Sequence, residues 1–392
     1  MSKTSRFFFT AWRPAIAVLA LAFVAYLLYF HNISHLLPGY SAGELQTHSS
    51  AADWHTIWHN PVNAPYKVLV WLAAALGHHS ILLTRIIAAS FGVAGVAIFF
   101  LIARQWYGFR TAFFGTILFA TSAGFLHIAR LGSPQVLQLS ILLILGLLLW
   151  YLRSKRPLAG YLLVILYALL WYVPGMLWFE IFSLVLLRAG AIRRLRQAAS
   201  LHKTIWIVSF LVLIAPLVVA SLRTPRVALQ AIGLPTGLHA LSHAATNLSN
   251  ALLAIGIHGP GTPTLWVGHA PLLDAIELVF CAIGFYYYIW HERSARTMFL
   301  LGASIISLVL IGLGGMVTLA VLLPLLYLCI AGGLHHLLGR WLRVFPRNPV
   351  ARAAGLLIIC AMLFFTVLYQ TRSYFVAWPH SPATRQAFSR KQ

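Results

Sequence analysis

The residues best suited to chemistry lie in one polar stretch, PGYSAGELQTHSSAADWHTIWHNPVNAPYK, which runs from Pro38 to Lys67. Its carboxylates and imidazoles are those of Glu44, Asp53, His48, His55 and His59. A carboxylate can act as a general base, and imidazole nitrogens can bind a divalent metal ion. If the protein catalyses a reaction, we expect its acid or base in this stretch.

The chain has only six acidic residues, and three of them are candidates for a functional role. Glu44 is the first choice as a base or as a ligand of an acceptor or metal, with a loop or helix-capping role as the alternative. Asp53 is the second choice, because its place just before Trp54 favours capping the N-terminus of a helix. Glu180 lies in an apolar segment, where an ionisable group is costly and suggests function. Its alternatives are a pair with a histidine or arginine, or a protonated carboxyl bonded to a backbone carbonyl.

Two histidines, His55 and His59, are spaced i, i+4 on an expected helix. Such a pair can present two nitrogens to a divalent ion, and Glu44 or His48 could complete the ligand set. The alternative is that histidines simply keep an outer surface hydrated where lysines and acids are scarce. A divalent metal ion is therefore a candidate cofactor, and no cofactor is certain.

Three cations, Lys67, Arg85 and Arg130, are candidates for binding a phosphate. Arginine can hold two phosphate oxygens, and lysine acts as a point charge. The alternative is that these side chains extend to the membrane surface while their apolar stems stay in the lipid.

The composition indicates a membrane protein. Hydrophobic residues make up 60% of the chain and charged residues 9%, whereas soluble domains are roughly half apolar and a quarter charged. Several apolar runs approach the roughly 20 residues that cross a bilayer as a helix, and none alternates as a barrel strand would. We expect an all-α polytopic membrane protein with about eleven transmembrane helices.

The net charge of +22 does not indicate nucleic-acid binding here. With the N-terminus in the cytoplasm, most lysines and arginines fall on the cytoplasmic side, as the positive-inside rule requires. The charge is then explained by insertion and by anionic membrane lipids. We expect a multi-pass protein of the inner (plasma) membrane whose active face is extracytoplasmic.

A single transmembrane domain is expected over residues 1–392, with a first outer loop at 37–80, a second at 223–270 and an outer tail at 372–392. The first loop should contain two interfacial helices separated by the prolines of NPVNAP. The second loop either contacts the acceptor or is a plain connector. Aromatic side chains of the tail, Tyr374, Phe375 and Trp378, are expected at the membrane interface. The expected spans are Ala15 to Leu36, Ile81 to Ala103, Thr111 to Ile128, Pro134 to Leu152, Leu158 to Val173, Pro174 to Leu187, Thr204 to Leu222, Pro271 to Trp290, Thr297 to Leu313, Met316 to Leu334 and Ala353 to Thr371.

The order of four segments resembles a known family. PGYSAGEL, NPVNAPYKVLVWLAAALG, TRIIAASFGVAGV and FATSAGFLHIARLGSPQVLQL resemble the N-terminal half of the C-type (GT-C) glycosyltransferases. The similar branch contains protein O-mannosyltransferases and lipid A aminoarabinose transferases (glycosyltransferase family 39-like). The resemblance covers roughly residues 38 to 140 by motif and the rest by hydropathy.

The family's motif residues map onto this chain only in part. Glu44 matches the glutamate of an Asp-Glu pair, but Gly43 stands at the aspartate position. Gln135 stands where a second acidic residue is usual. Lys67 lies close to the family's lysine, while Arg85 and Arg130 match recurrent arginines.

The resemblance implies a glycosyltransferase with a GT-C-like helical bundle. Such an enzyme moves a sugar from a polyprenyl-phosphate-linked donor to a cell-envelope acceptor, which is a glycan, a lipid or a protein. One alternative is a catalytically inactive relative that binds or assembles envelope glycans. Another is a transporter or flippase of lipid-linked material, although the internal repeat typical of transporters is not visible.

Overall fold

The computed structural model describes residues 19, 23–77, 80–154, 156–237, 241–292 and 294–390. Part of the expected first span, Ala15 to Leu36, lies outside the described residues. Within them the chain is helical, and its one β-bridge joins Tyr40 to Arg390. The expectation of an all-α fold is confirmed.

The helices of the first half begin at the expected outer loop. They are α2 (Ala42–Ser50), α3 (Trp54–His59), α4 (Ala64–Ala75), α5 (Leu82–Tyr107), α6 (Phe109–Thr121), α7 (Ala123–Arg130), the 3₁₀ helix η1 (Pro134–Ser140), α8 (Ile141–Arg153), α9 (Pro157–Leu170), α10 (Met176–Leu186) and α11 (Arg188–Gln197).

The second half continues with long helices and ends in short ones. They are α12 (Ser200–Arg223), α13 (Pro225–Ala231), α15 (Ala244–Gly256), α16 (Ala275–Trp290), α17 (Ala295–Gly312), the 3₁₀ turn η2 (Leu319–Val321), α18 (Leu323–Val344), α19 (Pro349–Arg372), the π-helical turn η3 (Ser373–Ala377), α20 (Trp378–His380) and α21 (Pro382–Ala387).

The described helices make this a multi-pass membrane protein. Six of them are long and apolar enough to cross a bilayer, and a bent pair, α6 with α7, raises the number to seven. Four shorter apolar helices, α4, α9, α10 and α16, have 10–17 residues. The expected count of about eleven spans stays a prediction, because these shorter helices do not reach the usual spanning length.

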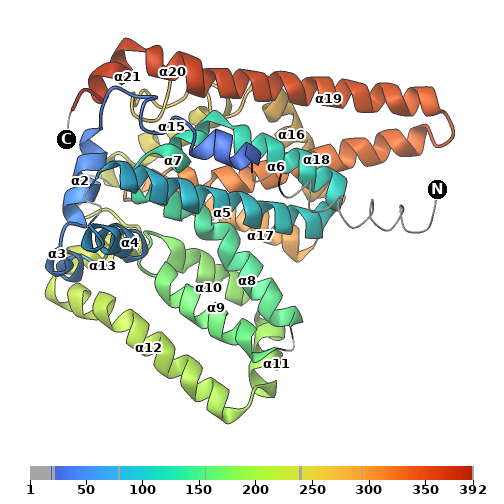
Figure 1. Ribbon diagram of the computed structural model, residues 1–392. Coiled ribbons are helices and arrows are strands. Elements are labelled where there is room, and N and C mark those ends of the chain that lie inside the picture. Colours follow the sequence, from blue (N-terminus) through green and yellow to red (C-terminus); the bar gives the residue numbers. More distant parts are fainter. Residues whose placement is uncertain are drawn as a thin grey trace, which may run out of the picture.

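The bundle has two distinct ends (Figure 1). The helices α2, α3, α4, α20 and α21 gather at one end, which we call the Glu44 end, and α11 lies at the opposite end, which we call the α11 end. The core centres on α18, whose first half is buried without interruption from Leu323 to Leu334. This helix packs closely on α16 because both carry a glycine at the crossing. A Cβ added at Gly284 or Gly333 would meet backbone of the opposite helix.

The segment that was expected to form one span from Thr111 to Ile128 is broken. Its two halves, α6 and α7, are bent by 62°. Ser122 causes the break, because its extended backbone ends α6 while its Oγ caps α7 by accepting from the amide of Phe125 at 3.3 Å. The side-chain oxygen of Gln370 accepts from the next free amide, that of Ala123, at 3.0 Å. The bend brings the end of α7 and the following turn against α2 and α5.

The tail folds back over the Glu44 end. Tyr374 and Trp378 are each 2% exposed, so the expectation that they anchor the tail at the membrane interface is wrong. The indole of Trp378 donates to the carbonyl of Pro263 at 2.9 Å, and the amide of Tyr40 donates to the carbonyl of Arg390 at 2.9 Å. Trp378 therefore joins the tail to the expected second outer loop, and the backbone bridge of Tyr40 with Arg390 joins the tail to the expected first one.

Candidate functional site

Glu44 sits in the first turn of α2 as part of a capping box. The hydroxyl of Ser41 accepts from the amide of Glu44 at 3.3 Å, and the carboxylate of Glu44 accepts from the amide and the hydroxyl of Ser41 at 2.9 and 3.2 Å. The sequence S-x-x-E before a helix is the usual signature of this motif. The carboxylate is fully buried, at 0% exposure.

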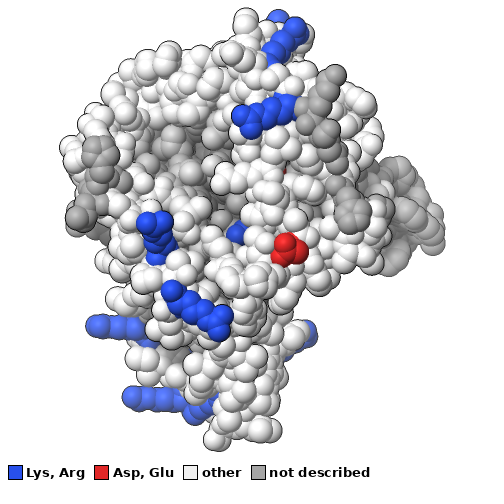
Figure 2. Space-filling view, turned by 90° about the vertical axis from the view of Figure 1, so that its left-hand side faces the viewer, with Lys and Arg blue, Asp and Glu red and all other residues white. Residues whose placement is uncertain are grey.

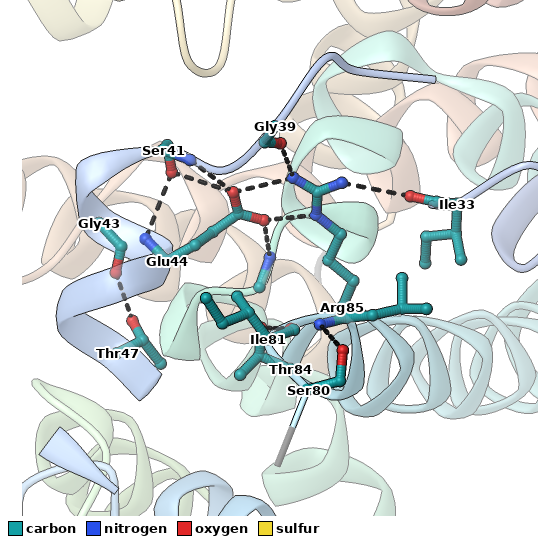
Figure 3. Close-up of polar contacts among 12 residues, drawn as sticks. Ile33, Gly39, Ser41, Gly43, Glu44, Thr47, Ser80, Ile81, Thr84 and Arg85 are labelled. Atoms are coloured by element: carbon teal, nitrogen blue, oxygen red, sulfur yellow. Dashed lines mark hydrogen bonds and ion pairs between the residues drawn. The ribbon is translucent and has the colours of Figure 1, made fainter. Parts of the chain in front are cut away.

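Arg85, in the first turn of α5, forms a bidentate ion pair with Glu44 (Figure 3). Its Nε and Nη2 donate to the two carboxylate oxygens at 2.7 and 3.0 Å. Two carbonyls, those of Gly39 and Ile33, accept further bonds at 2.8 and 3.3 Å. The guanidinium therefore donates four hydrogen bonds. Its ion pair with Glu44 is the one carboxylate–cation pair within 4.0 Å among the described residues.

The same carboxylate also fixes the turn after α7. The amide of Gly132 donates to Oε1 of Glu44 at 3.1 Å. A carboxylate has about four lone-pair positions, and the donors of Ser41, Arg85 and Gly132 fill them. Glu44 thus links α2, α5 and the α7–η1 turn, and it keeps no free acceptor position for a substrate proton.

Two other cations, Arg130 and Lys67, are buried without a carboxylate partner among the described residues. Arg130 donates to the carbonyls of Leu28 and His31 at 2.5 and 2.9 Å, and its Nε has no partner in the described part of the chain. Lys67 donates to the carbonyl of Asn60 at 2.8 Å. Burial lowers the pKa of Lys67 to about 8. The charge of each cation is therefore not neutralised by a carboxylate within 4.0 Å among the described residues.

Asp53 is an exposed helix cap. Its carboxylate accepts from the amide and the hydroxyl of Thr56 at 2.6 and 3.0 Å, in the first turn of α3. These bonds, the amide bond first, lower the pKa of Asp53. The capping interpretation made from the sequence agrees with this geometry.

The candidate metal ligands His48, His55 and His59 are not brought together with Glu44 in the described residues. The rings of His55 and His59 lie 4.2 Å apart on the exposed side of α3, where the Nδ1 of His59 is 2.9 Å from the carbonyl of His55. Glu44 faces Arg85 instead of these rings. Across the described ranges, no group of three or more His, Cys, Asp or Glu side chains is arranged to hold a metal ion. His48 carries a buried Nδ1 with no partner among those residues.

The two remaining candidates, Glu180 and Gln135, make no hydrogen bond with the side chains of Glu44 or Arg85. Glu180 is buried in α10 and accepts from the indole of Trp171 at 2.7 Å, while its Oε1 has no partner in the described residues. The expected partners, a histidine, an arginine or a backbone carbonyl, are replaced by an indole. The side-chain oxygen of Gln135 in η1 is buried and lacks a described partner.

A buried network around Glu277 was not foreseen. Tyr327 of α18 and Gln370 of α19 each donate to its carboxylate at 2.7 Å. The sequence signal was available, because Asp274 and Glu277 form a second capping box at the start of α16. The partners could not be read from the sequence, since they lie on helices far along the chain.

An apolar cavity of about 760 Å³ lies between α3, α4, α5, η1, α8, α9 and α12. Trp54, Trp58 and Pro65 line it at the Glu44 end, and Ile98 and Leu143 line it deeper in the bundle. The surface of the Glu44 end is hollowed and carries scattered basic side chains with little acid (Figure 2). The molecule thus combines an apolar chamber within the bundle with a basic surface at the Glu44 end.

Comparison with known proteins identifies the fold. No protein-family model and no curated protein matches the chain in sequence. It is similar to ArnT from Cupriavidus metallidurans, whose crystal structure bound to undecaprenyl phosphate gives a TM-score of 0.53 at 14% identity and covers 94% of this chain and 76% of that one. The apo structure of that ArnT gives 0.50 at 14% identity, with coverages of 96% and 77%. The chain therefore has the fold of the C-type membrane glycosyltransferases, as the resemblance predicted.

Proposed function

We propose that this chain is a glycosyltransferase that moves a sugar from a polyprenyl-phosphate-linked donor to a cell-envelope acceptor at the outer face of the inner membrane. The observation that carries the proposal is the apolar cavity that opens beneath α3 and α4. The ArnT fold supports the same class of donor, since one ArnT structure is bound to undecaprenyl phosphate.

The cavity has the lining that a prenyl chain requires and the size of a small-molecule site. Sites for drug-sized ligands measure roughly 300–1,000 Å³, and this cavity of about 760 Å³ lies within that range. Its lining is almost entirely aliphatic and aromatic, so an isoprenoid chain would bury apolar surface there.

The donor phosphate would bind to the cations that have no carboxylate partner. Lys67 lies on α4, the helix that also supplies Pro65 and Val68 to the cavity wall. Arg130 has a free Nε. Arg85 is less suited to this role than the sequence suggested, because Glu44 already neutralises it. A phosphate placed near Lys67 or Arg130 would supply the missing counter-charge.

We assign Glu44 to positioning rather than to proton transfer. A general base needs an open acceptor position within reach of the hydroxyl that it deprotonates, and the donors around Glu44 occupy its oxygens. The carboxylate instead holds Arg85 and Gly132 in place. For Glu44 to act as the base, one of these bonds would have to exchange when substrate binds.

One observation favours a second candidate, a non-catalytic protein that binds a polyprenyl carrier. The carboxylate of Glu44 is occupied, and Gly43 and Gln135 stand at positions where the family has acids. Among the described residues, no carboxylate lies within 4.0 Å of Lys67 or Arg130. Both functions need the cavity, and only the first produces transfer.

The test is sugar transfer from radiolabelled polyprenyl-phosphate sugars in envelope preparations, paired with binding of the unglycosylated carrier to the purified protein. Ala94→Phe would place a ring in the cavity, because Ala94 lines it. Ala97→Phe is the control on the same helix, exposed but outside the cavity lining. The proposal expects Ala94→Phe to abolish both carrier binding and transfer, while Ala97→Phe leaves both intact.

The carboxylate variants Glu44→Gln and Asp53→Asn complete the test at matched expression. Transfer lost in Glu44→Gln but kept in Asp53→Asn supports an enzyme that depends on the Glu44–Arg85 pair. Carrier binding without transfer from any donor, in the native chain, would favour the non-catalytic function. Absence of both would exclude the two candidates together.

A further inference from the structure

A second pocket is lined in part by α11, and this helix lies at the end of the bundle opposite α2 (Figure 1). The volume of the pocket is about 170 Å³, and it is formed where α8, α9, α11 and α12 meet. The side chains that give it chemical character are those of Tyr151, Arg156, Arg194, His202 and Trp206. None of its lining residues is acidic.

Two helices begin at this pocket. Pro157 is the first residue of α9, and Ala199 precedes the first residue of α12; both line the pocket. Neither helix has a side chain that caps its first turn. Uncapped amides and the positive end of the helix dipole favour an anion. The N-terminal ends of α9 and α12 therefore contribute partial positive charge to the pocket, in addition to the charges of Arg156 and Arg194.

An unsatisfied donor in the pocket wall points to a ligand independently. Trp206 is 8% exposed, and its buried Nε1 has no acceptor among the described residues. A buried N–H group almost always has a partner. Its neighbour His202 is held in place by the hydroxyl of Tyr161, 2.7 Å from Nδ1.

Arg194 is also fixed before any ligand binds. Its Nη2 donates to the carbonyl of Ser154, and its guanidinium carbon lies 5.9 Å from the centre of the Tyr151 ring. A guanidinium held in this way loses little conformational freedom when it binds a planar pair of oxygens. Arg156 is exposed at the rim and is free to turn toward the pocket.

We propose that this pocket binds a phosphate group, held by Arg156, Arg194 and the indole N–H of Trp206. The phosphate belongs either to the headgroup of an anionic phospholipid or to a free phosphate in solution. The helix α11 supports the lipid source, because it presents arginines together with exposed Ile192 and Leu195, as interfacial helices do. The site is separate from the proposed transfer site and does not depend on it.

The test has two arms on the full-length purified chain. In the first, native mass spectrometry follows retention of phosphatidylglycerol titrated into neutral detergent. In the second, the thermal unfolding midpoint is compared in sodium phosphate and in sodium chloride at equal ionic strength. Each arm uses the native chain, Arg156→Gln, Trp206→Phe and a control, Arg193→Gln, which removes an exposed charge of α11 outside the pocket.

We expect one ligand to bind the native chain and the Arg193→Gln control equally. Its dissociation constant should rise about tenfold in Arg156→Gln and in Trp206→Phe, since each loses one bond to a charged group. A response to phosphatidylglycerol alone identifies a lipid headgroup, and a rise of the unfolding midpoint in sodium phosphate, the second arm, identifies a free-phosphate site. The proposal is overturned if neither ligand binds, or if Arg193→Gln weakens binding as much as the pocket variants do.

Discussion

The buried pair of Glu44 and Arg85 predicts a strong energetic coupling between α2 and α5. We consider Glu44→Gln, Arg85→Gln and the double variant. In Glu44→Gln, one side-chain oxygen can still accept from Arg85 or Gly132. The new amide group, however, points its N–H bonds at the donors of Ser41 and Arg85, and the guanidinium loses its counter-charge in a site with 0% exposure of the carboxylate.

The magnitude follows from the burial of both partners. Removing one member of a buried ion pair costs about 3–5 kcal/mol, because the remaining charge is left uncompensated. Arg85 keeps bonds to the carbonyls of Gly39 and Ile33, so we place Glu44→Gln near the lower limit, at about 3 kcal/mol. Arg85→Gln leaves the carboxylate with Ser41 and Gly132 and should cost a similar amount. The double variant should lose about 2 kcal/mol less than the sum of the two.

The measurement is the free energy of unfolding in mixed micelles titrated with sodium dodecyl sulfate, followed by circular dichroism. Each variant is compared with Gln46→Ala, which removes an exposed side chain from the same helix. Single losses below about 1 kcal/mol that add up in the double variant would show that the pair contributes no more than a surface salt bridge. That result would refute the positioning role of Glu44.

Three further outcomes are expected. Burial lowers the pKa of Lys67 to about 8, so carrier-phosphate binding should weaken as the pH rises through 8. Between pH 8 and the ordinary lysine pKa of 10.5, Lys67 holds its proton in the unfolded chain but not in the folded one. The free energy of unfolding should therefore increase over this range. pH titrations of carrier binding and of unfolding, with Lys67→Met as control, measure both effects. Gly284→Ala should destabilise the protein by about 1–3 kcal/mol through the α16–α18 crossing, while Gly43→Ala, which meets nothing within 4 Å, should not. Asp53→Ala should speed hydrogen exchange in α3, whereas Asp53→Asn retains the cap, and transfer should be unchanged in both.

The helical architecture was largely predictable because membrane insertion is recorded in composition. The expected spans at Ile81, Thr204 and Ala353 correspond to α5, α12 and α19. The break at NPVNAP was also expected, and Asn63 there has a left-handed backbone, with φ of 61°. The bend at Ser122 was missed, because a serine inside an apolar run does not by itself indicate that a helix stops.

The contacts of the site were less predictable than its position. Arg85 was weighed between a phosphate ligand and a surface anchor, and the ion pair with Glu44 was not considered. The two residues are 41 positions apart, and whether they meet depends on how α2 packs against α5. Local signals performed better: the cap made by Asp53 could be recognised from its immediate neighbours. The partner of Glu180 was missed for the same reason as that of Arg85, since a sequence indicates which groups need partners but not which partner is near.

Because acids are scarce in this chain, the Glu44–Arg85 pair leaves the other buried cations of the Glu44 end without a carboxylate partner among the described residues. Had a free aspartate stood at Gly43 or a second acid at Gln135, the cations there could have been neutralised internally. Instead one acid neutralises one arginine, and Lys67 and Arg130 remain buried without a carboxylate partner among the described residues. Buried cations are costly unless a counter-charge binds. The phosphate of the proposed lipid donor would supply that charge, so the scarcity of acids that argues against a carboxylate base also argues for an anionic ligand.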